Sequence, residues 1–415
     1  MTRAILNKGV TATLYAYMFA LTCSIAGMEA FSWLSALLFL LAWGASRLEK
    51  KPLNTFRING DLFLWLFWCV ALLGALFGPT KSFEVKKFIV ADLRWILLIY
   101  AFSFIWAQRW DRFKSIIPTL FFFAGLVAIY AIVQVPTGLE LAREVGNPKN
   151  AVGEYWRSHG FFYSTMTYSY SFGMIFCLML ALWIYKVFDG LVGKYLLPIT
   201  TVLIGISLVL SFTRGLWLAL AAAVFAMLYT VRRKWGYWLI GGGTVLVLLA
   251  MAVSSVFRER VTSIVDFENA SNVGRLQVWQ GNWAMFLDNP ILGVGHRQNT
   301  EFLPKYYEQI GLETDYVSNA HNTYLQILGG MGLLGLLFYI GFMFLFLKTA
   351  WVLWRDSQDK LLKSVGLGSL GAMICLHVGG MTQVNIFDGE VNHVFVFIVG
   401  ILMAANFQHK SIISS

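Results

Sequence analysis

Apolar stretches of roughly twenty residues recur along the whole chain, and this pattern restricts the fold more than any other feature. A helix of about that length crosses the hydrocarbon layer of a lipid bilayer. A span that is not part of a closed barrel must satisfy its backbone hydrogen bonds internally, as a helix does. We therefore expect an all-α polytopic membrane protein.

The composition agrees with this expectation. Charged residues make up 13% of the 415 residues, whereas a soluble globular protein has about 25%. Arg3 and Lys8 precede an apolar stretch without a clear cleavage site, so we expect a first transmembrane helix there and no cleaved signal. We predict one integral membrane domain, residues 1–415, with twelve spans near 12–28, 30–46, 62–78, 88–106, 115–135, 164–186, 195–213, 215–231, 237–257, 322–347, 365–383 and 392–408.

Two long polar stretches, 136–163 and 258–321, separate some of these spans, the second between spans nine and ten. Loops rich in Lys and Arg stay in the cytoplasm. The loops on the other side of the membrane from these two stretches, counted with both termini, hold 19 of the 32 Lys and Arg residues. The same loops and termini hold only 6 of the 22 Asp and Glu residues. We therefore expect both termini in the cytoplasm and both polar stretches in the periplasm of a bacterial inner membrane. The net charge of +10 then needs no nucleic-acid partner.

Motifs for metal or nucleotide chemistry are missing from the sequence. There is no CxxC, no HExxH, no Walker loop and no DxD-type carboxylate pair in a loop. The sequence therefore predicts neither a metal site nor a cofactor. The candidates for chemistry are the basic residues on the predicted outer side.

Arg214 lies in the short turn of "LSFTRGLW", between predicted spans seven and eight. A charge at that depth is costly unless it reaches the interface or meets a partner. It is either a snorkelling arginine at the end of a helix hairpin or part of an anion site. Arginine suits a phosphate, because its planar guanidinium donates two parallel hydrogen bonds and keeps its charge.

Arg275 begins a segment with helical periodicity, in which Leu276, Trp279, Trp283 and Phe286 share one face. We predict an amphipathic helix near 275–287 that lies in the membrane interface. Arg275 would stand at its N-terminus, where the helix dipole and free N–H groups favour anions. A solvated loop arginine is the alternative.

Lys81 and Arg157 are weaker candidates for the same anion site. Lys81 precedes two further lysines, and all three can simply meet lipid headgroups. Arg157 stands beside His159 and a run of tyrosines, which also occur in ordinary interfacial belts.

His321, in "SNAHNTYLQIL", comes directly before the tenth apolar stretch. A lone histidine there can be an ordinary helix-start residue, with Asn319 or Asn322 as the cap. The arginines on the same side favour another interpretation, because histidine accepts protons near neutral pH and nearby cations keep it neutral. Such a base, with arginines that bind a diphosphate, suits attack of a hydroxyl on a carbon with a diphosphate leaving group. Asp388 is a candidate to assist this base, or a solvated loop residue.

Three blocks, "LSFTRGLWLAL", "GRLQVWQGNWAMFLDNPILGVG" and "HNTYLQILGGMGLLGLL", resemble the O-antigen ligase/polymerase superfamily and follow the same order. The resemblance covers about 200–345, and the rest of the chain agrees by topology. Twelve spans with one dominant outer loop before the histidine are most similar to the ligase branch, the WaaL type.

This resemblance implies a membrane glycosyltransferase of the C type. Such an enzyme moves a glycan from undecaprenyl diphosphate to a sugar hydroxyl of lipid A-core among the membrane lipids. It acts on the periplasmic face, with inversion and without metal or nucleotide sugar. By motif match, His321 is implied as the catalytic base and Arg214 and Arg275 as diphosphate-binding residues. Lys81 and Arg157 follow less directly, and the candidates for support are His159, Asn322 and Asp388.

Two alternatives stay open. A polymerase of the same superfamily uses the same donor but another lipid-linked glycan as acceptor. A secondary transporter also fits twelve spans, but carriers place charges near the bilayer midplane on broken helices. Here the charges gather at one surface, and the two halves show no inverted repeat.

Overall fold

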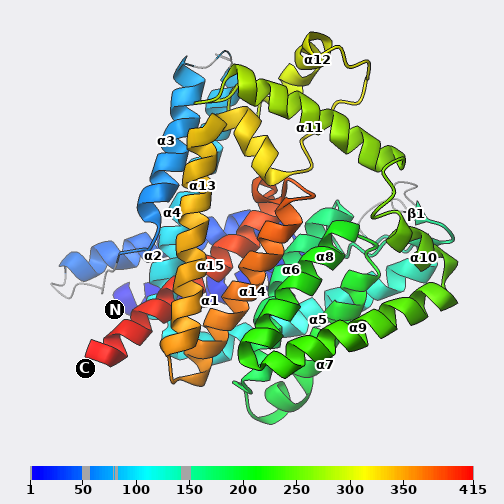
Figure 1. Ribbon diagram of the computed structural model, residues 1–415. Coiled ribbons are helices and arrows are strands. Elements are labelled where there is room, and N and C mark those ends of the chain that lie inside the picture. Colours follow the sequence, from blue (N-terminus) through cyan, green and yellow to red (C-terminus); the bar gives the residue numbers. More distant parts are fainter. Residues whose placement is uncertain (1, 49–56, 78, 80–82, 142–150, 415) are drawn as a thin grey trace.

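The computed structural model describes residues 2–48, 57–77, 79, 83–141 and 151–414. It is a bundle of helices (Figure 1), which confirms the expected all-α membrane class. Nine helical segments of the described chain are long and apolar enough to cross a membrane. They are α2 (Ile25–Leu48), α5 (Phe113–Thr137), α6 (Thr165–Ile184), η3 (Val192–Leu196) with α7 (Leu197–Val209), α8 (Arg214–Val231), α9 (Arg233–Val253), α13 (Thr323–Asp356), α14 (Lys360–Gly380) and α15 (Gly389–Ser414).

Helices also lie at the other three predicted spans. These are α1 (Thr2–Cys23), α3 (Asp61–Phe77) and α4 (Phe83–Gln108), of which α3 is apolar but has 17 residues. A helix therefore stands at each of the twelve predicted positions. Since nine segments of the described chain meet the length and hydropathy needed for a span, the number twelve stays a prediction.

The centre of the bundle is formed by α6, α14 and α15, most of whose residues are buried. In Figure 1 these helices lie between the α3–α4–α13 group and the α5–α7–α8–α9 group. Apolar residues face outward on α9, including Leu246, Leu248 and Val253. Such a surface suits contact with lipid, because its side chains are apolar and the helix satisfies its own backbone hydrogen bonds.

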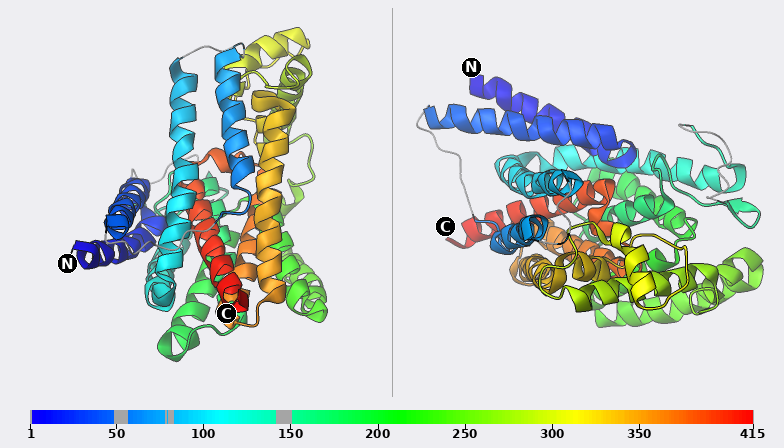
Figure 2. Two further views of the ribbon diagram at one scale, coloured as in Figure 1. Left: turned by 90° about the vertical axis from the view of Figure 1, so that its left-hand side faces the viewer. Right: turned by 90° about the horizontal axis from the view of Figure 1, so that it is seen from above.

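The predicted outer stretch 258–321 is largely helical. It contains most of α10 (Ser255–Thr262), α11 (Ala270–Asp288) and α12 (Asn299–Gln309), and α11 crosses the end of the bundle (Figures 1 and 2). A small apolar cluster under α11 and α12 holds this part together, with Met285, Leu303 and Tyr306 among its members. The shorter elements are η1 (Trp110–Arg112), η4 (Asn385–Phe387) and the hairpin of β1 (Ala151–Val152) and β2 (Tyr155–Trp156).

The turn after α11 is docked on the glycine-rich start of α13. The N–H groups of Val294 and Gly295 donate to the carbonyls of Gly329 and Gly330 at 3.0 and 2.9 Å. At Gly332 α13 is kinked with φ of 63°, and a Cβ there would lie 2.3 Å from a backbone oxygen. Glycine is required because it adopts this φ and lets two backbones touch. This contact fixes α11 above the bundle, next to the residues that precede α13.

Candidate active site

The turn between α7 and α8 gathers arginines from distant parts of the chain. The Nε of Arg157 donates to the carbonyl of Ser211 at 2.9 Å, and the Nε of Arg260 donates to the carbonyl of Phe212 at 3.1 Å. Phe212 has φ of 50°, a left-handed conformation that is uncommon for a bulky residue. Arg214 follows as the first residue of α8. One tight turn therefore holds two guanidinium groups and supplies a third.

Arg214 connects this turn to the segment between α10 and α11. Its two Nη atoms donate to the carbonyl of Ser263 at 2.5 Å and to Oδ1 of Asn272 at 3.3 Å. Asn272 itself donates to the same Ser263 carbonyl at 3.1 Å. Within the described chain these bonds use two of the five N–H donors of the guanidinium. The structure thus shows a partnered arginine with donors to spare, and its part in an anion site stays a prediction.

Arg275 does not lie at a helix N-terminus, so that prediction is wrong. Helix α11 begins at Ala270, and Asn269 caps it by accepting from the N–H of Ser271 at 3.2 Å. Arg275 is in the second turn, where the helix dipole adds little. The small and polar residues before Arg275 hid the first turn from a periodicity argument.

The guanidinium of Arg275 differs from those of Arg157, Arg214 and Arg260 in its hydrogen bonding. It is half-buried, and no described residue accepts a hydrogen bond from it or pairs with it. Burial lowers its pKa, while Tyr170 and Tyr316 act in the opposite direction. A half-buried cation without an acceptor is costly unless a ligand supplies one.

Four arginines form one electrostatic group, which we call the arginine cluster: Arg157, Arg214, Arg260 and Arg275. Burial, with repulsion from Arg260 and Arg214, lowers the pKa of Arg157 to about 10. Burial and the charge of Arg275 lower the pKa of Arg260. Among the described residues, none of the four arginines forms an ion pair with a carboxylate; the arginine ion pairs involve other arginines. Glu259 and Asp266 offset the positive charge of the cluster only at longer range. An anion with several acceptor oxygens would relieve this repulsion.

Sequence reasoning missed Arg260 as a site residue. Arg260 is the third residue of the polar stretch 258–321, and the local sequence does not distinguish it from a solvated loop arginine. The signal that singled out Arg214, a basic residue next to the outer end of a predicted span, applies to Arg260 as well.

His321 lies within electrostatic range of Arg275, one member of the arginine cluster. Its pKa is lowered by burial and by the charge of Arg275, against a raising effect of the hydrogen bond with Gln383. Its Nδ1 lies 2.9 Å from Oε1 of Gln383, and its Nε2 lies 3.2 Å from the hydroxyl of Ser318. We therefore expect a neutral imidazole near pH 7, as a base requires. Neither Gln383 nor Ser318 was a candidate from the sequence.

The backbone around His321 is specially shaped. His321 has φ of 44°, a left-handed conformation, and its N–H donates to Oδ1 of Asn319 at 2.9 Å. Trp279 of α11 donates to the carbonyl of Ala320 at 2.7 Å, which ties the helix of Arg275 to the His321 turn. Non-glycine residues in this region of φ are uncommon and occur at sites under functional constraint.

The other predicted site residues have different positions. Asn322 caps α13, since its side chain accepts from the N–H groups of Tyr324 and Leu325. Asp388 accepts from the Thr167 hydroxyl at 2.5 Å and from the first N–H groups of α15, so it holds helix ends together. The structure gives neither a hydrogen bond to His321. Lys81 lies outside the described residues.

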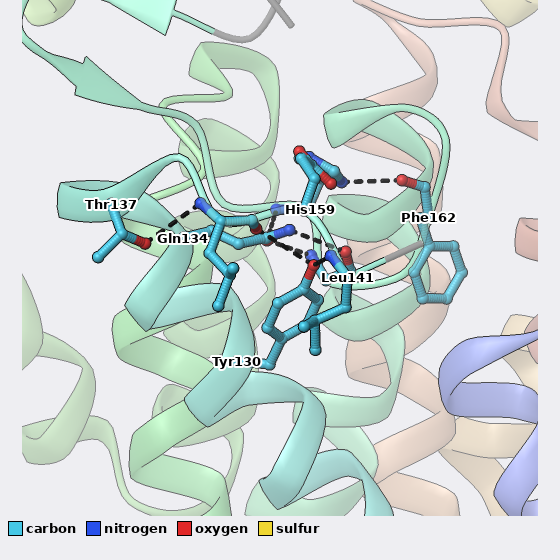
Figure 3. A network of polar contacts seen from close by, with 9 residues as sticks. Tyr130, Gln134, Thr137, Leu141, His159 and Phe162 are labelled. Carbon is cyan, nitrogen blue, oxygen red and sulfur yellow. Dashed lines mark hydrogen bonds and ion pairs between the residues drawn. The ribbon is translucent and has the colours of Figure 1, made fainter. Parts of the chain in front are cut away.

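His159 follows Arg157 by two residues and is held in a network of polar contacts (Figure 3). Its Nε2 lies 2.6 Å from Oε1 of Glu140 and its Nδ1 lies 2.8 Å from the carbonyl of Phe162. Gln134 of α5 accepts from the N–H groups of His159 and Gly160. Because both ring nitrogens are engaged and the side chain is 2% exposed, His159 is a structural residue of this turn.

Replacing His159 by alanine is expected to destabilise the protein by about 1–3 kcal/mol, because the buried Glu140 carboxylate loses its partner. A lower melting temperature in detergent would show this. The control is Leu141→Ala in the neighbouring segment, where the side chain is 64% exposed. Equal melting temperatures for both variants would contradict the structural role.

Comparison with known proteins agrees with the resemblance noted in the sequence. Residues 199–340 match the sequence model of a family described as O-antigen ligase (Wzy_C). This range contains three members of the arginine cluster together with His321. The chain is also 27% identical over 207 residues to the teichuronic acid biosynthesis protein TuaE of Bacillus subtilis strain 168. That match spans 48% of this chain and 41% of the length of the relative.

Proposed function

We propose that the chain, whose residues 199–340 match the O-antigen ligase family, is a membrane glycosyltransferase with a lipid-diphosphate-linked glycan as donor. The observation that supports this most is the arginine cluster beside a neutral histidine. A diphosphate offers several charged oxygens to guanidinium groups, and an acceptor hydroxyl offers a proton to the imidazole.

The reaction is one displacement at the anomeric carbon of the donor glycan. The acceptor oxygen forms a bond to that carbon as the bond to the diphosphate oxygen breaks, and the configuration inverts. The hydroxyl proton passes to His321. Arg275, with donors of the other three arginines, stabilises the negative charge that grows on the diphosphate.

The protein prepares this site before any substrate binds. Backbone carbonyls, the Thr213 hydroxyl and an asparagine side chain hold three of the arginines in place. Arg157 and Arg214 each donate two hydrogen bonds, and Arg260 donates one. Arg275 has no such acceptor in the described chain. Donors fixed in this way stabilise developing charge without having to reorganise during the reaction.

The specific reaction that we propose is O-antigen ligation. The donor is a glycan on undecaprenyl diphosphate, and the acceptor is a sugar hydroxyl of lipid A-core. The excess of Lys and Arg in the opposite loops supports a site on the periplasmic face of the inner membrane, with both termini in the cytoplasm. Lys81 stays a candidate for diphosphate binding.

Polymerisation of a lipid-linked glycan is the second candidate. The name of the relative TuaE places that protein in teichuronic acid biosynthesis. A site that recognises the shared donor diphosphate is compatible with either acceptor. The arginine cluster and His321 would have the same roles in both reactions.

A reconstitution tests the proposal. Purified protein is mixed with undecaprenyl-diphosphate glycan and lipid A-core, without nucleotide and with chelator, and the lipopolysaccharide is followed by gel shift. We expect a shifted band with wild type. A ladder of longer lipid-linked glycan without acceptor would indicate the polymerase. Neither product from folded protein would overturn the assignment as a glycosyltransferase.

The rate of transfer is expected to fall on the acid side of neutrality. The reaction needs neutral His321, whose pKa lies below its ordinary value of 6.5 because of burial and Arg275. Activity is therefore present around pH 7 and is lost as the pH falls through a midpoint below 6.5. Initial rates measured between about pH 5 and pH 8 give this midpoint. A midpoint above 6.5 would contradict a base in this environment.

A further inference from the structure

The two ring nitrogens of His321 face two different kinds of partner. Nδ1 lies 2.9 Å from Oε1 of Gln383, and Nε2 lies 3.2 Å from the hydroxyl of Ser318. Gln383 is held by its own backbone, since its carbonyl accepts from the Thr323 hydroxyl at 2.9 Å, at the start of α13. The segment between α14 and η4 therefore holds this amide in position.

A carboxamide oxygen only accepts hydrogen bonds, so the atom that faces it must donate. Nδ1 of His321 then carries the proton, and Nε2 keeps the lone pair that a base needs. We infer that Gln383 is a positioning residue that fixes His321 as the Nδ1–H tautomer and directs Nε2 toward the acceptor hydroxyl. This inference rests on the proposed function of His321.

The Ser318 hydroxyl marks the place of the acceptor hydroxyl. It is a donor of the same chemistry, at 3.2 Å from Nε2, and a sugar hydroxyl that replaced it would meet the same lone pair. On attack, the acceptor proton moves to Nε2 as the new C–O bond forms and the bond to the diphosphate breaks. Nδ1–H continues to donate to Gln383, so the imidazolium that results keeps its partner.

A neutral partner matters at this site. A carboxylate in place of Gln383 would also orient the ring, but it would stabilise the imidazolium and leave less of the histidine in the neutral form at low pH. Gln383 orients the ring without adding a charge. The charge of Arg275, on α11, also acts on His321, and it favours the neutral form.

The test measures the protonation of His321 directly, without substrate. Full-length protein in detergent is treated with diethyl pyrocarbonate, which reacts with neutral imidazole, over a range of pH. The modified His321 peptide is quantified by mass spectrometry. The variants are Gln383→Leu and Gln383→Glu. The control is Gln408→Leu. Gln408 is a half-buried glutamine that donates to the carbonyl of Ala107 at 3.2 Å. It lies near the C-terminal end of α15, far from His321.

We expect the modification midpoint to move in opposite directions in the two variants. Gln383→Leu removes a bond that raises the pKa of His321, so the midpoint moves to lower pH. Gln383→Glu adds a carboxylate, so the midpoint moves to higher pH. Gln408→Leu leaves it unchanged. If the folded Gln383→Glu variant titrates like wild type, Gln383 does not act on the His321 ring and the inference is overturned.

A second measurement separates this inference from the proposed function. Loss of an orienting partner typically lowers activity about 10- to 100-fold, and we expect such a decrease in transfer for Gln383→Leu. An active wild type with an essential His321 and unchanged Gln383 variants would overturn the positioning role alone. A wild type without transfer, but with the two opposite shifts of the midpoint, would overturn the proposed function and leave the hydrogen-bond assignment standing.

Discussion

Replacing His321 by alanine is expected to lower the rate of glycan transfer by about two to four orders of magnitude, the range for loss of a positioned general base. The imidazole is the basic group that the structure places beside the arginine cluster, and its lowered pKa keeps it able to accept a proton. The initial rate of the gel shift, with saturating donor and acceptor, measures the effect.

The matched control for this variant is His409→Ala. His409 lies near the C-terminal end of α15, whereas His321 precedes the start of α13. The folded His409→Ala variant should transfer glycan at the wild-type rate. Similar donor binding in wild type and His321→Ala would show that the loss belongs to the chemical step. Full activity of folded His321→Ala would remove it as the base.

Replacing Arg275 by lysine is expected to lower the transfer rate about 100-fold, the lower range for removal of one donor to a developing negative charge. Lysine keeps the positive charge but cannot offer two parallel N–H groups to a phosphate. Since no described residue accepts from Arg275, the change removes no internal hydrogen bond of the described chain. The loss should therefore appear in the rate and not in the melting temperature.

Arg355→Lys is the control for the same chemical change. Arg355 is exposed near the end of α13, and its ion pair with Asp356 at 2.6 Å is exposed as well. Because an exposed ion pair contributes little to stability, the replacement of Arg355 should alter neither the transfer rate nor the melting temperature. Arg214→Lys is a useful contrast, because it also breaks the contacts to Ser263 and Asn272 and should lower both quantities. An unchanged rate for Arg275→Lys would take Arg275 out of the diphosphate site.

The sequence by itself determined the class of the fold and the approximate place of each span. Both follow from local properties, because a membrane-spanning helix needs its own run of apolar residues. The predicted span 215–231 and α8 (Arg214–Val231) end at the same residue. The three blocks that contain Arg214, Arg275 and His321 were also visible as local patterns.

Errors arose where the local pattern is weak. The first turn of α11 is small and polar, so Arg275 was predicted at a helix end that lies five residues earlier, at Ala270. The helix α12 was not predicted in the stretch 258–321, because its apolar residues pack on a small cluster instead of forming a long run. His159 and Asp388 were candidates for support, and their hydrogen bonds run to Glu140 and Thr167 and not to His321, so a supporting role for them stays a prediction.

Only the tertiary structure decided which side chains meet. Arg157 and Arg260 bind carbonyls of the same turn from segments about a hundred residues apart in sequence, and Gln383 reaches His321 across 62 residues. These contacts depend on how α11 docks on the glycines of α13 and how the α7–α8 turn presents its carbonyls. Packing between distant segments leaves no periodic signal in the sequence, because each partner looks locally like an ordinary loop residue.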